Sequence, residues 1–171
     1  MALDLLLRDG PRMIDILWRS VVIGVGATAL MDVWALILHA AIGQPLPNWG
    51  LVGRWVWHLR HGQVFHDDIS AAEPFASEKA LGWVFHYAVG IAYALILVAI
   101  VGPAWLSAPR FLPAWIWGLV TVAAGWFLLA PGLGAGWALA KTPNPAKGRI
   151  LNLIAHTVFA IGLYGTALIL A

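Results

Sequence analysis

The 171-residue sequence lacks cysteine, and only 11% of its residues are charged. Without cysteine the chain forms no disulfide and offers no thiolate to a metal. A formal net charge of +2, without a polybasic run, does not indicate a nucleic-acid partner. The sequence shows no Ser-His-Asp triad, no glycine-rich phosphate loop and no thiol nucleophile. It therefore predicts no catalytic residue and assigns no enzyme class.

Apolar residues dominate the composition of the chain. They make up 61% of the chain, against about 45–50% in an average soluble domain. A water-soluble fold of this size leaves too much of its surface exposed to hide so many apolar side chains. The eleven tryptophans are typical of side chains that gather at membrane interfaces. The composition therefore predicts a protein that lives in a lipid bilayer.

Four apolar stretches are long enough to cross a bilayer, which takes about 20 helical residues. They cover about residues 20–43, 80–102, 112–140 and 150–171, and Pro131-Gly132 interrupts the third. Only helices satisfy their backbone groups in lipid at this length. The sequence thus predicts an all-α integral membrane protein. We expect a four-transmembrane-helix bundle with one long polar loop, residues 44–79, between helices 1 and 2.

Two further segments have an amphipathic pattern. Residues 1–19 are expected to form an N-terminal segment ahead of the transmembrane domain, residues 20–171. This segment is either an interfacial helix or, in its first part, an extension before a natural start at Met13. Within the long loop, the pattern from Trp49 to Phe65 favours a second interfacial helix.

The positive charges indicate an orientation. With four spans, the loops 44–79 and 141–149 share one face, and the N-terminal segment and the 103–111 turn share the other. Six lysines and arginines lie on the first face and four on the second. The positive-inside rule therefore places loops 44–79 and 141–149 in the cytoplasm.

The histidines of spans two and four are expected to lie at equal depth. Both spans begin at the loop face, which puts His86 and His156 roughly 9 Å below it. Gly82 and Gly90 flank His86 at helical spacing, and Asn152 precedes His156 by one turn. Small residues here leave room for a neighbouring helix or a flat macrocycle. The pair is a candidate site for a haem, a chlorophyll-type pigment or a metal. The alternative is interhelical hydrogen bonding and close packing alone.

Asp32 is the only charged residue within span one. An ionised aspartate at the bilayer centre costs roughly 2.5–3.5 kcal/mol on insertion scales. It must find a partner, and Thr28 one turn earlier or a nearby histidine are the candidates. Intramembrane ionisable residues often handle protons or ions, so Asp32 is a functional candidate, with structural pairing as the alternative.

The long loop holds a third candidate site. His58, His61, His66 and Asp67 carry imidazole and carboxylate groups that suit a divalent metal of the zinc type. Their spacing matches no strong metal-binding signature. A solvated helix at the interface is therefore the alternative interpretation.

Several short motifs resemble a known family. They are Gly24–Trp34, Gly53-Arg54-Trp55, Phe65-His66-Asp67, Leu81-Gly82-Trp83, His86-Tyr87 and Thr142-Pro143-Asn144-Pro145. Together with the order of spans, these motifs resemble a family of small bacterial inner-membrane proteins known as domain of unknown function 2938. The resemblance covers about residues 13–171. It implies four spans in a bacterial inner membrane, and it implies no activity.

Three functional hypotheses follow. The first is a ligand-binding bundle whose histidine-rich face holds a divalent metal, a haem or a pigment. The second is a non-catalytic accessory subunit of a larger energy-transducing or transport complex, in contact with other membrane subunits or with copies of itself. The third is a proton-linked transporter or membrane enzyme that works through Asp32.

Overall fold

A computed structural model describes residues 12–171, and every regular element within this range is a helix. Four helices are long and apolar enough to cross a membrane. They are α2 (Met13–Ile42), α4 (Glu78–Val101), α5 (Phe111–Ala124) continued through η3 (Gly125–Leu129) and α6 (Ala130–Gly132), and α7 (Pro145–Leu170). The expected all-helical architecture with four long apolar helices is thereby confirmed.

The connections contain shorter helices. They are α3 (Trp49–Leu59), η1 (Ile69–Ala71), η2 (Pro103–Leu106) and η4 (Trp137–Leu139). The predicted interfacial helix from Trp49 to Phe65 corresponds to α3, which ends earlier than expected.

Two helix bounds differ from the expected spans. The first long helix begins at Met13, so residues 13–19 are part of it. Arg12 is the N-cap of this helix, and the rest of the predicted amphipathic segment, residues 1–11, lies outside the described residues. The third long helix ends at Gly132 and does not reach residue 140.

Local backbone chemistry explains the early end of the third helix. Pro131 lacks an N–H and crowds the carbonyl one turn earlier, near Phe127. The chain accommodates this with the wider π-helical turn of η3. Gly134 (φ +91°) and Gly136 (φ +74°) then adopt left-handed conformations that turn the chain away.

Small residues bring the long helices together. α2 packs against both α4 and α7, and α5 packs against α7. A Cβ on Gly24 would lie 2.5 Å from Ile91 Cα, and a Cβ on Gly162 would lie 2.6 Å from Ala27 Cα. Such contacts let backbones approach closely, as is typical of helices that pack in lipid.

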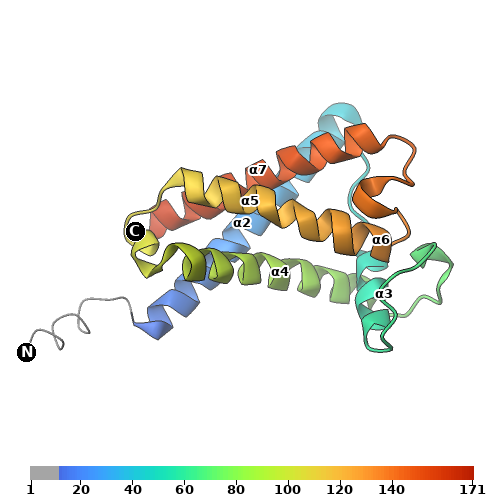
Figure 1. Ribbon diagram of the computed structural model, residues 1–171, viewed down its shortest axis with the longest axis horizontal. Coiled ribbons are helices and arrows are strands. Elements are labelled where there is room, and N and C mark those ends of the chain that lie inside the picture. The colour runs from blue at the N-terminus through green and yellow to red at the C-terminus, as the bar shows by residue number, and fades with distance from the viewer. Residues whose placement is uncertain (1–11) are drawn as a thin grey trace, which may run out of the picture.

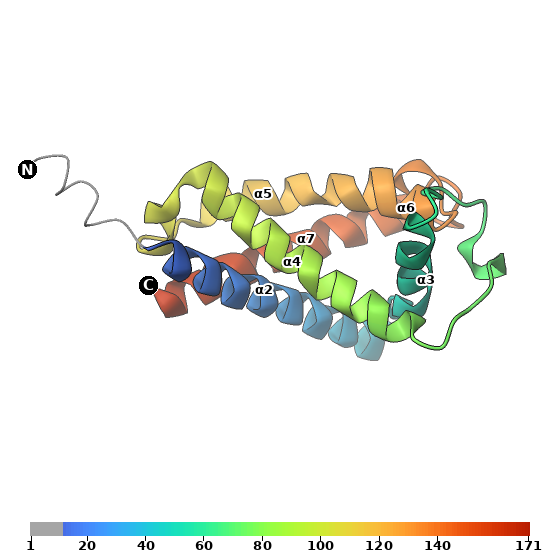
Figure 2. The same ribbon diagram turned by 90° about the horizontal axis from the view of Figure 1, so that it is seen from below.

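At one end of the bundle, α4 and α5 diverge, and α3 spans the gap between them (Figure 2). α3 lies across the bundle axis, beside the start of α4 and below α6 (Figure 1). Asn48 caps its first turn by accepting hydrogen bonds from the backbone N–H groups of Gly50 and Leu51. Val52 and Trp55 on its inner face are buried. α3 therefore closes this end of the bundle.

At the opposite end, Arg19 joins three parts of the chain. Its guanidinium donates to the Leu106 carbonyl of η2 at 2.9 Å and to the Leu170 carbonyl at the end of α7. Carbonyls at a helix C-terminus have no partner within the helix, so this contact satisfies one of them.

Candidate functional site

Asp32 forms the centre of a polar cluster between α2 and α4. Its Oδ1 lies 3.0 Å from His86 Nε2, and its Oδ2 accepts a 3.0 Å hydrogen bond from the Tyr87 hydroxyl. The Asp32 side chain is 21% exposed and that of His86 is 15% exposed. Thr28 instead donates to the Gly24 carbonyl, at 2.8 Å. Of the two partners expected for Asp32, the structure therefore selects the histidine.

Glycine makes this cluster possible. A Cβ on Gly90 of α4 would lie 2.0 Å from Thr28 Oγ1 of α2. Only a residue without a side chain lets α4 come this close to α2, about one turn from His86. The close approach brings a short carboxylate within hydrogen-bond reach of two consecutive α4 side chains.

α3 supplies the third side of the cluster. The indole of Trp49 stacks on the His86 imidazole, with ring centroids 3.9 Å apart and planes 29° apart. Trp83 approaches the same imidazole edge-on, with centroids 5.9 Å apart. When Asp32 is ionised, His86 Nε2 carries the proton that it donates, and Nδ1 keeps its lone pair.

A cavity of about 250 Å³ lies where α4 and α5 diverge. Both His86 and His156 line it, together with polar groups of Thr28 and Thr121. The remaining wall is mostly apolar and includes Trp55 of α3 and Phe159 of α7. The two histidines that were expected at equal depth thus face one shared space.

The tautomer of His156 follows from its hydrogen bonds. Its Nδ1 lies 2.9 Å from Thr121 Oγ1 and 3.1 Å from the Gly118 carbonyl. The Thr121 hydroxyl donates its own proton to the same carbonyl at 2.6 Å. Nδ1 therefore carries the proton and donates to both oxygens, so Nε2 keeps a free lone pair.

The other residues predicted to flank the histidines have different roles. A Cβ on Gly82 would lie 1.8 Å from the Trp49 carbonyl, so the space beside Gly82 is filled by α3. Gly90 contacts Thr28 of α2 and also lines the cavity. Asn152 is half-buried and is not among the residues that line the cavity. A neighbouring helix thus occupies the space beside Gly82, whereas Gly90 borders both a helix and the cavity.

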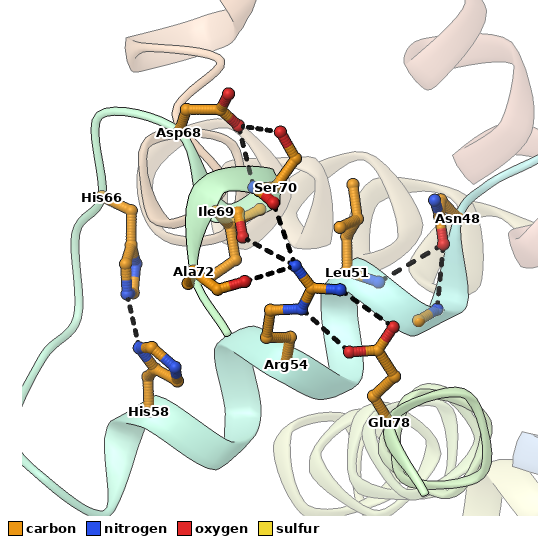
Figure 3. A network of polar contacts seen from close by, with 11 residues as sticks. Asn48, Leu51, Arg54, His58, His66, Asp68, Ile69, Ser70, Ala72 and Glu78 are labelled. Carbon is orange, nitrogen blue, oxygen red and sulfur yellow. Dashed lines mark hydrogen bonds and ion pairs between the residues drawn. The ribbon is translucent and has the colours of Figure 1, made fainter. Parts of the chain in front are cut away.

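Two of the loop histidines, His58 and His66, form a pair. His66 Nδ1 donates to the Gly132 carbonyl at 2.9 Å, so its Nε2 accepts a 3.0 Å hydrogen bond from His58 Nδ1 (Figure 3). His61 instead accepts from Arg60, and Asp67 is fully exposed. Within residues 12–171, no three His, Asp or Glu side chains gather as a metal would require. The predicted set His58, His61, His66 and Asp67 is therefore not assembled.

A groove of about 640 Å³ runs along the outer side of the Asp32 cluster. Asp32 lines it, with the indoles of Trp49 and Trp83. Trp49 also lines the cavity, and so does His86. The Asp32–His86 pair therefore stands between the groove and the cavity.

All these residues lie in a region with a known family relationship. The model of a family described as "Protein of unknown function (DUF2938)" matches residues 21–170. The chain belongs to this family. The predicted resemblance is thereby confirmed. No curated protein and no solved structure matches the chain.

Sequence reasoning missed the group that fixes α3 in this DUF2938 protein. The buried Arg54 of α3 donates from Nε and Nη2 to the Glu78 carboxylate at 2.8 and 3.0 Å (Figure 3). Its Nη1 donates to the carbonyls of Ile69, Ser70 and Ala72. The hydrogen bond to Glu78 raises the pKa of Arg54 above its ordinary value, against the opposing effect of burial. In the sequence, Gly53-Arg54-Trp55 is only a short motif, and nothing in its spacing indicates the partner.

Proposed function

We propose that this protein spans a membrane with α2, α4, the α5–α6 unit and α7, and that it works as a proton-linked carrier. Large apolar side chains exposed along these helices support the membrane location, for example Ile37, Ile100 and Ile169. The family resemblance and the charge distribution support a bacterial inner membrane, with loops 44–79 and 141–149 in the cytoplasm.

The Asp32–His86–Tyr87 cluster carries the proposal. A carboxylate paired with an imidazole inside a membrane helix bundle is the arrangement found in proton relays. With ionised Asp32 and neutral His86, the cluster has one negative charge. One added proton makes it neutral overall, and the 3.0 Å contact lets the two side chains share that proton.

The two spaces beside the cluster give it access from two directions. Asp32 borders the groove and His86 borders the cavity, so a proton accepted on one side can leave on the other. The cavity of about 250 Å³ is smaller than the roughly 300–1,000 Å³ of pockets for drug-sized ligands. This size favours water or a small molecule over a haem or a pigment. Four transmembrane helices enclose little space for a transport path. We therefore propose that the protein acts as a homo-oligomer.

Infrared spectroscopy of the purified protein in lipid nanodiscs tests proton handling directly. The pH is stepped between about 8 and about 5, the range in which histidine-linked groups titrate. We expect a change in the carboxyl band that disappears in Asp32→Asn, whereas the imidazole bands of the other histidines remain as an internal reference. Tyr87→Phe should retain the change at a shifted pH, because it removes one donor and keeps the carboxylate.

Asp67→Asn is the matched control, since Asp67 is exposed and outside the cluster. It should leave the Asp32 signal unchanged. A spectrum that Asp32→Asn does not alter would remove the cluster from proton handling and would end the proposal.

A further inference from the structure

We infer that the groove beside Asp32 binds an amphiphilic organic ammonium cation. This inference deepens the proposed function, because it names the chemical class that would exchange with the proton. The site itself stands on the geometry of the groove, and only the exchange step rests on proton handling by the cluster.

The charges in the groove favour a cation at Asp32. The groove is also lined by Glu78 and Lys79. Glu78 is already matched by the two hydrogen bonds from Arg54. Asp32 meets only His86 and Tyr87, which are both neutral donors when the cluster holds no extra proton. In that state one negative charge remains at Asp32, at the groove.

Lys79 is the positively charged residue of the groove, and its exposed position limits how strongly it repels a bound cation. It is exposed, and within residues 12–171 it forms no ion pair with Asp32 or Glu78. A lysine on a flexible stem extends readily into water. Its positive charge still weakens the binding of a cation. Removing this charge should therefore strengthen binding, whereas removing the charge of Asp32 should weaken it.

Aromatic and aliphatic walls define the rest of the ligand. Trp49 and Trp83 line the groove with ring centroids 5.3 Å apart, and indole faces attract ammonium groups. Leu36, Leu46 and Pro47 add an apolar wall that suits alkyl or aryl substituents. A hard inorganic cation would need six or more oxygen ligands, which this set does not supply. The chemistry therefore points to an organic cation.

Exchange follows from charge balance at Asp32. An ammonium group beside the carboxylate favours the cluster without its extra proton, so one proton leaves as one monovalent cation arrives. The charged or titratable groups facing Asp32 are His86 and Tyr87 of α4, with Glu78 and Lys79 farther along the groove. α3 and its N-cap contribute the neutral Asn48, Trp49 and Gly50. Cation affinity should therefore rise as the pH rises.

Equilibrium binding of benzyltrimethylammonium to the full-length protein in nanodiscs tests the site. Neopentylbenzene, its uncharged isostere, is the ligand control and should not show saturable binding. We expect Asp32→Asn to weaken binding by more than about tenfold, the equivalent of about 1.4 kcal/mol. Trp83→Leu should weaken it by roughly threefold to tenfold through the lost cation–π contact.

Lys79→Met should strengthen binding, whereas Asp67→Asn should leave it unchanged. Lys79→Met and Trp83→Leu leave the Asp32 hydrogen bonds intact, so they test the site even if Asp32→Asn fails to fold. No saturable binding of the cation, equal binding of the isostere or weaker binding in Lys79→Met would overturn the inference.

The two proposals fail separately. An intact infrared response of Asp32 without ammonium binding would remove the cation site and keep proton handling. Ammonium binding that depends on Asp32 and does not change with pH would keep the site and remove the coupling.

Discussion

Gly53 of α3 and Gly82 of α4 lie against each other's backbones where the two helices cross. A Cβ on Gly53 would lie 1.8 Å from the Glu78 carbonyl, and a Cβ on Gly82 would lie 1.8 Å from the Trp49 carbonyl. Neither position leaves room for a methyl group. This crossing places Trp49 against His86 and Trp55 in the wall of the cavity. The position of the site therefore depends on having glycine at both positions.

Gly53→Ala should therefore displace α3 and destabilise the protein. Overpacking a close contact typically costs about 1–3 kcal/mol, and the clash here is with backbone that cannot rotate away. Thermal unfolding in nanodiscs measures the loss. Gly165→Ala is the matched control, because a Cβ on Gly165 of α7 would meet nothing within 4 Å. There alanine should leave stability unchanged or raise it by about 0.5–1 kcal/mol. Equal effects of the two substitutions would contradict this account of the crossing.

Arg54→Lys should release the loop that α3 holds. A lysine has a single ammonium and cannot reach both the Glu78 carboxylate and three backbone carbonyls in the planar arrangement that arginine provides. We expect amide hydrogen exchange to increase in residues 60–77 and to stay constant in α7. Arg60→Lys is the control, since Arg60 is exposed and lies over the Trp57 ring at 3.3 Å. Unchanged exchange in Arg54→Lys would show that the loop is held by other contacts.

Arg19→Gln should weaken the opposite end of the bundle. It leaves the Leu170 carbonyl of α7 and the Leu106 carbonyl of η2 without their shared donor. Loss of hydrogen bonds to a charged group costs about 1.5–3 kcal/mol each at most, so a lower unfolding temperature is expected. Arg110→Gln, at an exposed arginine near the same end, should have little effect. Equal unfolding temperatures for Arg19→Gln and the unaltered protein would refute this role.

The four long helices could be predicted because long apolar runs determine them directly. The shared location of His86 and His156 could also be predicted, since the rise of a helix is fixed and both spans begin at the same face. The interruption at Pro131-Gly132 is visible in the sequence, but the apolar content continues past Gly132 and favours a span that reaches residue 140. Proline, a π turn and two left-handed glycines end the helix at Gly132. A hydropathy profile reports the polarity of side chains and carries no information on backbone geometry.

Side-chain pairing across helices could not be predicted. Nearly every surface of α2 and α4 is apolar, so the sequence does not fix how each helix is rotated about its axis. The pairing of Asp32 with both His86 and Tyr87 depends on that rotation, which Gly24 and Gly90 set by close contact. The pairing of His58 with His66, apart from His61 and Asp67, could not be predicted for a related reason. Their positions follow the path of the loop, and Arg54 fixes that path through backbone carbonyls that carry no sequence signal.

The turn after the loop histidines should depend on acidic pH through Asp68. The Ser70 hydroxyl and backbone N–H donate to this carboxylate and hold its pKa below the ordinary aspartate value. Because the pKa is lowered in the folded state, the stabilisation is present above the ordinary value. It is lost as the pH falls through the lowered one.

The measurement is amide exchange of Ser70 and Ala71 on descending pH, corrected for the intrinsic rate. Asp68→Asn still accepts both hydrogen bonds and cannot titrate, so it should remove the pH dependence and keep the turn. Since Asp68 is exposed, we expect a local effect without global unfolding. The same pH dependence in Asp68→Asn would assign it to another group.

His156 should have its proton on Nδ1 and a free Nε2 facing the cavity. The two oxygens beside Nδ1 both accept, since the Thr121 hydroxyl gives its own proton to Gly118. Nitrogen NMR of ¹⁵N-histidine-labelled protein distinguishes the two tautomers, and His156→Gln assigns the signal. Thr121→Val removes one acceptor and leaves the Gly118 carbonyl, so the Nδ1–H form should persist with a more mobile ring. A signal from Nε2–H would show that the cavity presents a donor instead of a lone pair, and a ligand there would then have to accept a hydrogen bond.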